Sequence, residues 1–531
     1  MGAATQIKQV THANVVANSD QPNVLVSTSP ATGRKLGEVW VTPPAEAEAV
    51  MTRARQAQDS WKALGLKGRL AVMRKLKRTM YRYTDLLVDT LVAEQGRPRF
   101  EALIEFWCTI ELLAYDIRIA PRTLAPEHTL VPLVPHRVHW VEKNPYGTVL
   151  VIAPWNFPLL LSLTPIFSAL IAGNTVVYKP SEFSTQMGEA LVKVIYEAGV
   201  PREVFQIVHG AGDLGAALVK ARPNKIVFTG SPTTARKIAA AAGELLIPLT
   251  LELGGKDAAI VLEDADLDRT AAGLVWGGLL NAGQACLSVE RIYVRCEVAD
   301  QLVAKMAKII NEQVRIGPGE APETTMGAIT TDAQLNIIDS QVREAIEQGA
   351  RLVSGGRVVE DRAGRFYLPT LITNATPMMR IVSEETFGPV IAVIPVSSDE
   401  EALKQANSTR YGLTGSVWTG NRARGIALAK RMRVGHASVN DHIVSASVPS
   451  LPWGGMDDSG YGRTRGREGL LDMIVTQVIS AERFKPLPRE LFWYPYTPLK
   501  LTLIQRAIDV LYAPRWLDKL RALVFWQRRE R

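Results

Sequence analysis

Three side chains in turn-like segments could together carry out covalent chemistry on a carbonyl group. Cys286 lies in NAGQACLS, where its thiolate could be a nucleophile, although a free cysteine is more often a buried packing residue. Glu252 ends the apolar stretch PLTLE before two glycines, and there it could be a general base with a raised pKa or a salt-bridged core residue. Asn156, in the proline-bounded APWNFP, could donate its amide to an oxyanion or shape the turn.

Three predicted strand ends carry residues suited to a nucleotide. FTGS places Gly230 and Ser231 at a helix start, where the backbone can approach a phosphate, but a plain turn would look the same. In YKPSE, Lys179 and Glu182 could hold the two hydroxyls of an adenosine ribose or form a solvated strand end. VHGAGDLG adds Gly212 at a third strand end, although its glycines do not have the GxGxxG spacing of the standard dinucleotide fingerprint.

The elements that must position these residues alternate between strands and helices. Residues 45–120 have apolar side chains at helical spacing, in two runs. Strands are then expected at GTVLVIAP, NTVVYKP, VFQIVHG, KIVFTGS and PLTLELGG, with helices between most of them. Short apolar strands that alternate with helices predict a doubly wound parallel sheet, and a second α/β stretch is expected from about 254 to 465.

The composition is that of a soluble globular protein, with 47% hydrophobic and 21% charged residues among 531. Three cysteines without CxxC spacing argue against a disulfide framework and a structural zinc site. The HxxH formed by His136 and His139 lies in an alternating pattern, so we expect a hairpin there and no metal. The polar N-terminal segment has no apolar signal region, so we expect a cytoplasmic protein.

The combination of motifs resembles the NAD(P)-dependent aldehyde dehydrogenase superfamily over about residues 25–485. The matching stretches are APWNFP, AGNTVVYKPSE, FTGS, LELGGKDAAIV, NAGQAC, EETFGPV and PWGGMDDSGYGR. Glu252 and Cys286 are 34 positions apart, which fits the family's spacing between base and nucleophile. Three departures are Ala235 in place of a frequent glycine, PWGGM, with Trp453 and Met456, in place of PFGG.K, and a tail of about 45 residues past the usual end.

The resemblance implies an α/β fold with a Rossmann-type NAD-binding domain, an α/β catalytic domain and a β oligomerisation arm. It implies the following boundaries: 20–126 and 146–253 for the NAD-binding domain, 254–465 for the catalytic domain, 127–145 and 470–485 for the arm, and 486–531 for the tail. The arm implies a homodimer or homotetramer, and we expect no nucleic-acid partner.

The resemblance also implies a mechanism. The Cys286 thiolate would attack the aldehyde, while the Asn156 amide and the Cys286 backbone N–H hold the oxyanion. Hydride transfer to the nicotinamide would leave a thioester, and Glu252 would activate the water that releases the acid. Lys179 completes the implied catalytic set. The implied cofactor contacts are Ile152, Trp155, Lys179, Ser181, Glu182, Gly212, Gly230, Ser231, Glu385 and Phe387.

Cofactor and substrate preferences follow from a few side chains. Glu182 would repel a 2′-phosphate, which favours NAD, although some members of the family also accept NADP. An apolar aliphatic or aromatic aldehyde is expected, because the following side chains could form an apolar tunnel: Phe106, Trp107, Phe157, Leu159, Leu160 and Leu287. The alternatives are succinate semialdehyde as substrate, or a non-catalytic scaffold of the same fold.

The tail differs from the rest of the chain in charge and pattern. Residues 486–531 hold nine Lys and Arg against four Asp and Glu, which is +5 of the total net charge of +8. Two amphipathic helices are predicted, with these apolar residues on their faces: Leu501, Ile504, Ile508, Leu511 and Tyr512, then Trp516, Leu520, Leu523 and Val524. Such helices either lie on a membrane surface or dock on a neighbouring subunit, and neither is long enough to span a bilayer.

Overall fold

The computed structural model describes residues 23–129, 136–484 and 489–524. Contacts divide the chain into two units. The first consists of Met1–Ala125 and Lys143–Thr476, and the second of Pro126–Glu142 and Gln477–Arg531. The positions predicted in 20–22, 130–135, 485–488 and 525–531 lie outside the described residues.

The N-terminal part of the first unit is a β-hairpin followed by helices. The hairpin pairs β1 (Val24–Thr28) with β2 (Lys35–Trp40). The helices are α1 (Ala47–Ala63), α2 (Gly65–Arg82), α3 (Thr84–Gln95) and α4 (Arg99–Thr123), after the short η1 (Pro44–Glu46). The second of the two runs expected over 45–120 is therefore two helices, because the backbone leaves the helical conformation at Tyr83. Gly96 ends α3 in the left-handed conformation, with φ 66°, which favours glycine.

A six-stranded sheet follows, and it confirms the predicted doubly wound arrangement. Its order is β19-β9-β8-β5-β6-β7, and its parallel strands are β5 (Thr148–Ile152), β6 (Thr175–Lys179), β7 (Phe205–Ile207), β8 (Lys225–Thr229) and β9 (Leu249–Glu252). The short β19 (Gly460–Tyr461) pairs antiparallel with β9. The connecting helices are α5 (Leu160–Ala172), α6 (Thr185–Glu197), α7 (Gly212–Lys220) and α8 (Pro232–Glu244).

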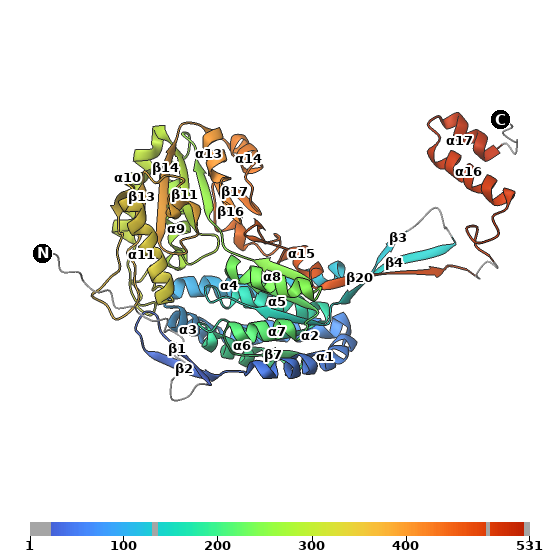
Figure 1. Ribbon diagram of the computed structural model, residues 1–531, viewed down its shortest axis with the longest axis horizontal. Helices are drawn as coiled ribbons and strands as arrows, with labels where there is room; N and C mark the ends of the chain where they lie inside the picture. The colour runs from blue at the N-terminus through green and yellow to red at the C-terminus, as the bar shows by residue number, and fades with distance from the viewer. Residues whose placement is uncertain (1–22, 130–135, 485–488, 525–531) are drawn as a thin grey trace. The chain divides into compact units, whose positions relative to one another are not determined.

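Both faces of this sheet are covered by helices, as Figure 1 shows. Val149 and Val151 belong to a core with α4, α5 and α6 residues, whereas Leu150 and Ile152 belong to a core with α1 and α7 residues. Alternate side chains of one strand therefore enter two different cores. This is why the strands read as continuous apolar runs in the sequence.

The remainder of the first unit is built on a seven-stranded sheet. Its order is β12-β13-β14-β11-β10-β16-β17. Its strands are β10 (Asp257–Val261), β11 (Val289–Arg295), β12 (Arg351–Ser354), β13 (Thr370–Thr373), β14 (Val390–Val396), β16 (Thr414–Trp418) and β17 (His436–Val439). All pairs are parallel except β12 with β13. The largest buried cluster of the chain is centred on these strands.

The second sheet's helices and small elements complete the unit. The helices around this sheet are α9 (Leu267–Leu279), α10 (Cys296–Gln313), α11 (Asp332–Glu347), α12 (Arg380–Ser383), α13 (Asp399–Ala406) and α14 (Arg422–Ala429). α15 (Gly466–Leu471) instead packs against α4 and α5. The short strands β15 (Tyr411–Gly412) and β18 (Met456–Asp457) pair with each other. Single helical turns lie at η2 (Leu280–Gly283) and η3 (Ser445–Ser447).

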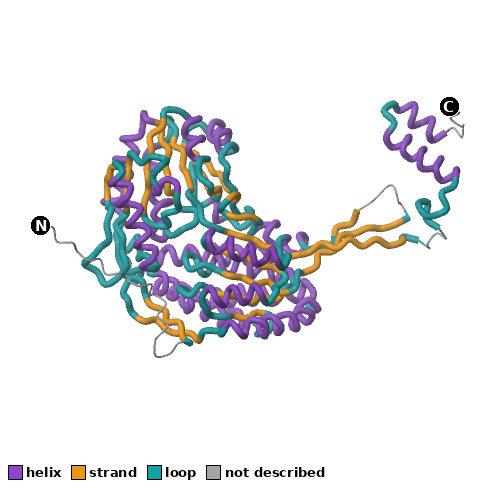
Figure 2. Tube along the Cα trace, in the orientation of Figure 1, coloured by secondary structure: helices purple, strands orange, loops and turns teal. Residues whose placement is uncertain are grey.

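The second unit contains most of a narrow three-stranded ribbon and two helices. β3 (Glu127–Thr129), β4 (Arg137–Pro145) and β20 (Ile474–Glu482) form a sheet of order β20-β4-β3 (Figure 2). β4 contains His139, as the expected hairpin requires, and His136 contacts Glu490, with 2.9 Å between Nε2 and Oε2.

α16 (Pro498–Tyr512) and α17 (Trp516–Val524) pack against each other. Both predicted tail helices are therefore present, although the side chains of Leu523 and Val524 lie outside the described part. Among the helices of the described ranges, none is long and apolar enough to cross a bilayer.

Candidate active site

The carboxyl ends of four parallel strands meet at one edge of the six-stranded sheet. In the register of the strands, Ile152 lies opposite Lys179 on one side and Phe228 on the other. Thr229 in turn lies opposite Glu252. Residues that the sequence placed in separate motifs therefore share one edge, which is where ligands bind in open parallel sheets.

Cys286 lies between η2 and β11, in a turn that only certain residues can form. Asn281 and Ala282 both have φ 54°, and Gly283 has φ 69°. A Cβ on Gly283 would overlap the Gly388 carbonyl, so glycine is required there. The partly buried Cys286 packs with Leu287 against a small buried cluster of Leu413, Ala446 and Trp453.

Asn156 is joined to the turn that carries Cys286 by hydrogen bonds in both directions. Its Nδ2 donates to the Gln284 carbonyl at 3.2 Å. Its own carbonyl accepts from Asn281 Nδ2 at 3.0 Å and from the Arg97 guanidinium. Asn156 is 4% exposed. Its amide is therefore held beside the thiol's turn, as an oxyanion donor must be.

Arg97 and Glu105 position this segment, and sequence reasoning missed both. They form an ion pair of 2.5 Å in which both side chains are buried. Glu105 Oε1 also accepts from the backbone N–H groups of Leu159 and Leu160, each at 2.9 Å, where α5 begins. The available signal was Glu105 within the largely apolar helical stretch EALIEFWCTIELLAY, because a charged residue on a buried helix face needs a partner.

Glu252 is buried at the end of β9, and its surroundings act on its pKa in opposite directions. Burial raises the pKa of its carboxyl. Hydrogen bonds from the Thr464 and Trp453 side chains and the positive charge of Arg465 lower it, whereas the Asp472 charge raises it. Burial is the largest of these effects, and a carboxylate with a raised pKa is a stronger proton acceptor, which suits a general base.

The Cys286 thiol has a raised pKa in the free protein. Burial is the main cause, and the charges of Glu252, Asp257 and Glu385 raise the pKa further. The Arg465 charge opposes them. The Glu252 charge thus acts on the Cys286 thiol, which places the predicted base and the predicted nucleophile in one electrostatic site.

Glu385 and Phe387 extend the site from the other sheet. Glu385 Oε1 accepts from the Gly255 N–H at 3.0 Å, and burial beside Glu290 raises the pKa of Glu385 to about 8. Phe387 has φ 53° and its N–H donates to Glu290 Oε1 at 2.9 Å. Its ring meets the Trp155 indole edge-on, with 5.5 Å between centroids. The contact joins two of the predicted cofactor contacts.

The predicted ribose and phosphate positions cluster at the strand ends. Lys179 Nζ donates to the Pro180 carbonyl at 3.1 Å, and burial lowers its pKa while the charges of Glu182 and Asp213 raise it. The Ser181 hydroxyl reaches Glu182 Oε2 at 3.4 Å. Gly212 begins α7, and Ser231, which follows Gly230, caps α8 by accepting from the Thr234 N–H at 3.3 Å. Two helix N-termini therefore start beside this edge, where they favour an anion.

The proposed apolar tunnel is only partly reflected in the packing. Leu287 lies beside Cys286, but Leu159 is fully buried in a core of the six-stranded sheet and Trp107 is 65% exposed. Within the described ranges no cluster of three or more His, Cys, Asp or Glu side chains could hold a metal ion.

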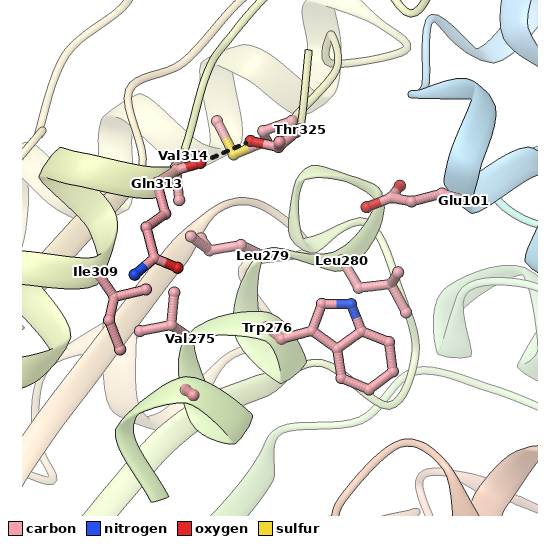
Figure 3. Close-up of a pocket in the computed structure, with 11 residues that line it drawn as sticks. Glu101, Val275, Trp276, Leu279, Leu280, Ile309, Gln313, Val314 and Thr325 are labelled. Carbon is pink, nitrogen blue, oxygen red and sulfur yellow. Dashed lines mark hydrogen bonds between the residues drawn. The ribbon is translucent and has the colours of Figure 1, made fainter. Parts of the chain in front are cut away.

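A cavity of about 180 Å³ lies next to the turn before Cys286 (Figure 3). Leu280, Trp276 and the carboxyl of Glu101 line it, and Glu101 Oε2 accepts from the Asn281 N–H at 3.0 Å. Burial raises the pKa of Glu101 to about 7. The cavity is thus connected to the thiol's turn through one hydrogen bond.

Comparison with known proteins agrees with the motifs. The model of the aldehyde dehydrogenase family matches residues 16–479. The chain is 35% identical over 491 residues to a 4,4'-diapolycopene aldehyde oxidase of Methylomonas sp, covering 92% of this chain and 91% of that protein. It is 36% identical over 454 residues to a putative succinate-semialdehyde dehydrogenase (NADP+) 2 of Mycobacterium tuberculosis, covering 85% and 87%.

Solved structures show the same fold. PnpE in complex with nicotinamide adenine dinucleotide superposes with a TM-score of 0.84 at 32% identity, covering 88% of this chain and 96% of that one. An NAD-dependent aldehyde dehydrogenase from Sinorhizobium meliloti superposes with a TM-score of 0.84 at 31% identity, covering 88% and 93%.

Proposed function

The chain belongs to the aldehyde dehydrogenase family and is an oxidoreductase that acts on aldehydes with NAD as cofactor, and we propose that Cys286, Asn156 and Glu252 carry out the reaction. The observation that supports these roles best is the pair of hydrogen bonds that joins Asn156 to the turn of Cys286. Glu252 acts electrostatically on the same thiol.

In the proposed reaction the Cys286 thiolate forms a bond to the aldehyde carbon. The Asn156 Nδ2 and the Cys286 backbone N–H then hold the oxyanion. Lys179, at the end of β6, helps to keep the groups of the site in position. NAD held by the predicted cofactor contacts would supply the hydride acceptor, and a thioester would then remain on Cys286. Glu252 takes a proton from water, the water adds to the thioester, and the carboxylate leaves as the thiol is restored.

A single substitution tests the nucleophile. Cys286→Ser removes the thiolate, so NADH formation from aldehydes should fall to a small fraction of the wild-type rate while NAD binding stays close to normal. Cys296→Ser is the matched control, because Cys296 is exposed at the start of α10 and has no proposed role. Substantial turnover by Cys286→Ser would show that another group is the nucleophile.

We propose an apolar aliphatic or aromatic aldehyde as the substrate. The side chains packed around Cys286 are Leu287, Leu413 and Trp453, which suit an apolar chain beside the carbonyl. Succinate semialdehyde is the alternative, supported by the name of one relative and by the Arg465 charge near the thiol. kcat/KM measured for hexanal, benzaldehyde and succinate semialdehyde separates the two, since only an acidic substrate should gain from that charge.

We propose that the chain is divided into the following domains. Residues 20–126 and 146–253 form the NAD-binding domain, and residues 254–465 form the catalytic domain. Residues 127–145 and 470–485 form an oligomerisation arm of a homodimer or homotetramer. The arm's sheet leaves β3 and β20 as edge strands, with Val478 of β20 at 72% exposure, and open edges favour pairing with another chain.

We further propose that the tail (residues 486–531) holds the enzyme at the cytoplasmic face of an anionic membrane. Large apolar side chains are exposed over the whole described tail: Phe492, Trp493, Tyr494, Tyr496, Leu499, Leu501, Leu503, Ile508, Leu511, Tyr512, Trp516, Leu517 and Leu520. Basic residues accompany them: Arg489, Lys500, Arg506, Arg515 and Lys519. Aromatic and basic residues on short amphipathic helices suit the interface of an anionic bilayer.

Co-sedimentation with phosphatidylglycerol vesicles tests the tail. The full chain should pellet at low salt, and a chain that ends at Lys485 should stay in the supernatant with its dehydrogenase activity intact. Trp516→Gln should weaken pelleting, whereas Trp40→Gln, an exposed tryptophan of β2, should not. If the full chain also stays in the supernatant, the membrane proposal fails and docking on a neighbouring subunit is the remaining role for the tail.

A further inference from the structure

Arg465 is a buried cation beside the active site that the motif comparison did not single out. It follows Thr464 directly before α15, and it is 6% exposed. Its Nη1 donates to the Ala446 carbonyl at 2.5 Å, and its guanidinium lies over the Trp453 ring, 5.2 Å from the centroid. Its Nε is buried without a hydrogen-bond partner among the described residues.

The backbone around Arg465 is held in an unusual conformation. Arg465 has φ 61°, which lies in the left-handed region that a long side chain rarely adopts. The preceding Thr464 exchanges two backbone hydrogen bonds with Trp453, at 2.7 and 2.8 Å. The same bridge therefore directs the Thr464 hydroxyl to Glu252 and the Arg465 side chain onto the Trp453 ring. Strained conformations of this kind are kept where the surrounding structure fixes them, often at functional sites.

The charges around Arg465 are those of the proposed chemistry. Glu252 and Cys286 both interact with it electrostatically. At the Cys286 thiol, the charges of Glu252, Asp257 and Glu385 oppose ionisation and that of Arg465 favours it. At Glu252, Asp472 opposes ionisation and Arg465 favours it. Two groups that must each become anionic during one turnover thus share one buried cation.

We propose that Arg465 is a positioning residue for charge: its fixed guanidinium stabilises the Cys286 thiolate during attack and the Glu252 carboxylate during hydrolysis. The inference rests on the proposed roles of Cys286 and Glu252. Burial keeps water from screening the charge, so the effect at short range is larger than at the surface. The Trp453 ring and the Ala446 carbonyl hold the guanidinium in place without neutralising it.

The test measures thiol ionisation directly, without aldehyde or turnover. Iodoacetamide alkylation of Cys286 is followed by peptide mass spectrometry from pH 6 to pH 10 in the full chain. Arg465→Met and Arg465→Gln should raise the pKa of the thiol by about one unit, which lowers the alkylation rate about tenfold throughout this pH range. Arg465→Lys should restore most of the wild-type profile. The exposed Cys296 peptide is the internal reference.

Arg463→Met is the matched control. Arg463 lies two residues away, and its guanidinium donates to the Gly455 and Gly462 carbonyls at 2.9 and 2.7 Å. The control removes a cation from the same loop and should leave the pH dependence of Cys286 alkylation unchanged. If Arg465→Met does not fold, as judged by thermal unfolding and NAD binding, Arg465→Gln and Arg465→Lys carry the comparison.

Two results would overturn the proposal. Unchanged alkylation profiles in Arg465→Gln and Arg465→Lys would show that the charge does not reach the thiol. A rise in KM for succinate semialdehyde alone, with an unchanged profile, would make Arg465 a substrate-binding residue instead. Failure of the proposed function can be told apart from failure of this proposal. If the proposed function is wrong, Cys286→Ser will retain turnover, whatever the Arg465 variants show.

Discussion

At the scale of single residues, a nearby carboxylate makes a buried thiol harder to ionise. Glu252 and Cys286 are such a pair, and both have raised pKa values. The protein opposes these raised pKa values with hydrogen bonds from neutral groups and with the buried charge of Arg465, rather than with exposure to water. The pH dependence of turnover should therefore respond to the side chains that touch Glu252.

Thr464→Val should shift the activity profile to higher pH. The Thr464 hydroxyl donates to Glu252 Oε1 and stabilises the carboxylate, so its loss raises the pKa of Glu252 further. A general base works when deprotonated, and the rising limb of kcat should move up by roughly one pH unit. Thr464→Ser keeps the hydroxyl and should follow the wild type. A shift to lower pH in the valine variant would contradict the assignment.

Glu182→Ser should weaken NAD binding and improve NADP binding. The substitution removes both the hydrogen bonds expected to the ribose and the repulsion of a 2′-phosphate. Glu182→Gln separates the two effects, because it keeps a hydrogen-bonding group and removes the charge. Dissociation constants for both cofactors, measured by fluorescence titration, check this. An unchanged NAD to NADP ratio in both variants would mean that Glu182 does not face the ribose.

The predicted catalytic residues could be found from the sequence, whereas the buried arginines that surround them could not. Motifs identified Cys286, Glu252 and Asn156 because each stands at a loop or strand end of recognisable sequence. Arg97 and Arg465 stand in segments where arginine is usually solvated, and only the packing shows that both are buried. A single sequence carries no signal for which arginine is enclosed.

At the scale of elements, the helix α4 carries acidic groups on its buried side. Asp116 is 1% exposed, the Ser168 hydroxyl reaches its Oδ2 at 3.3 Å, and its Oδ1 has no partner among the described residues. Burial raises the pKa of Asp116 to about 7. The folded protein therefore holds this proton more tightly than the unfolded chain does. Ionisation destabilises the fold increasingly as pH rises from about 4 to about 7, and to a constant extent above that.

Asp116→Asn should stabilise the protein more at pH 8 than at pH 5. We expect the gain to be about 3 kcal/mol larger at pH 8 than at pH 5, since the buried charge is removed. Thermal unfolding at both values measures it. Asp85→Asn, in which the side chain is 88% exposed on α3, is the control and should change little. An equal effect of Asp116→Asn at both pH values would contradict the raised pKa.

Helices and long strands were predicted more closely than short elements. The stretch PTTARKIAAAAGE indicates a helix, and α8 begins at its Pro232 and ends at its Glu244, because proline suits the first turn and the alanine run sustains the helix. The break between α2 and α3 was missed, since Tyr83 interrupts an otherwise unbroken apolar period. The two-residue strands β15, β18 and β19 were missed as well, because two residues cannot show a period.

At the scale of the whole molecule, the alternation of strands and helices predicted the parallel sheets, whereas the joining of the motifs in one site came from the resemblance. Local periodicity indicated strands and helices, but it could not indicate that Glu252 and Cys286 meet from two different sheets. The resemblance supplied that arrangement. The resemblance gives no prediction for the tail, because the match to the family model ends at residue 479.

Light scattering should give a mass of two or four times the 58.2 kDa chain over a range of concentrations. Val478→Lys places a charge on the exposed face of the edge strand β20 and should lower that mass. The chain that ends at Lys485 should keep the wild-type mass if the arm alone assembles the subunits. A single mass of 58.2 kDa at every concentration would contradict the oligomerisation arm.

The most direct test of the account is rapid mixing of Glu252→Gln with NAD and a reactive aldehyde. Hydride transfer precedes the step that needs Glu252, so we predict a burst of about one NADH per active site followed by near arrest. Intact mass spectrometry should then show the acyl group on the protein, and peptide mapping should place it on Cys286. A folded variant that gives no burst, or an acyl group on another residue, would contradict the assigned roles of Glu252 and Cys286.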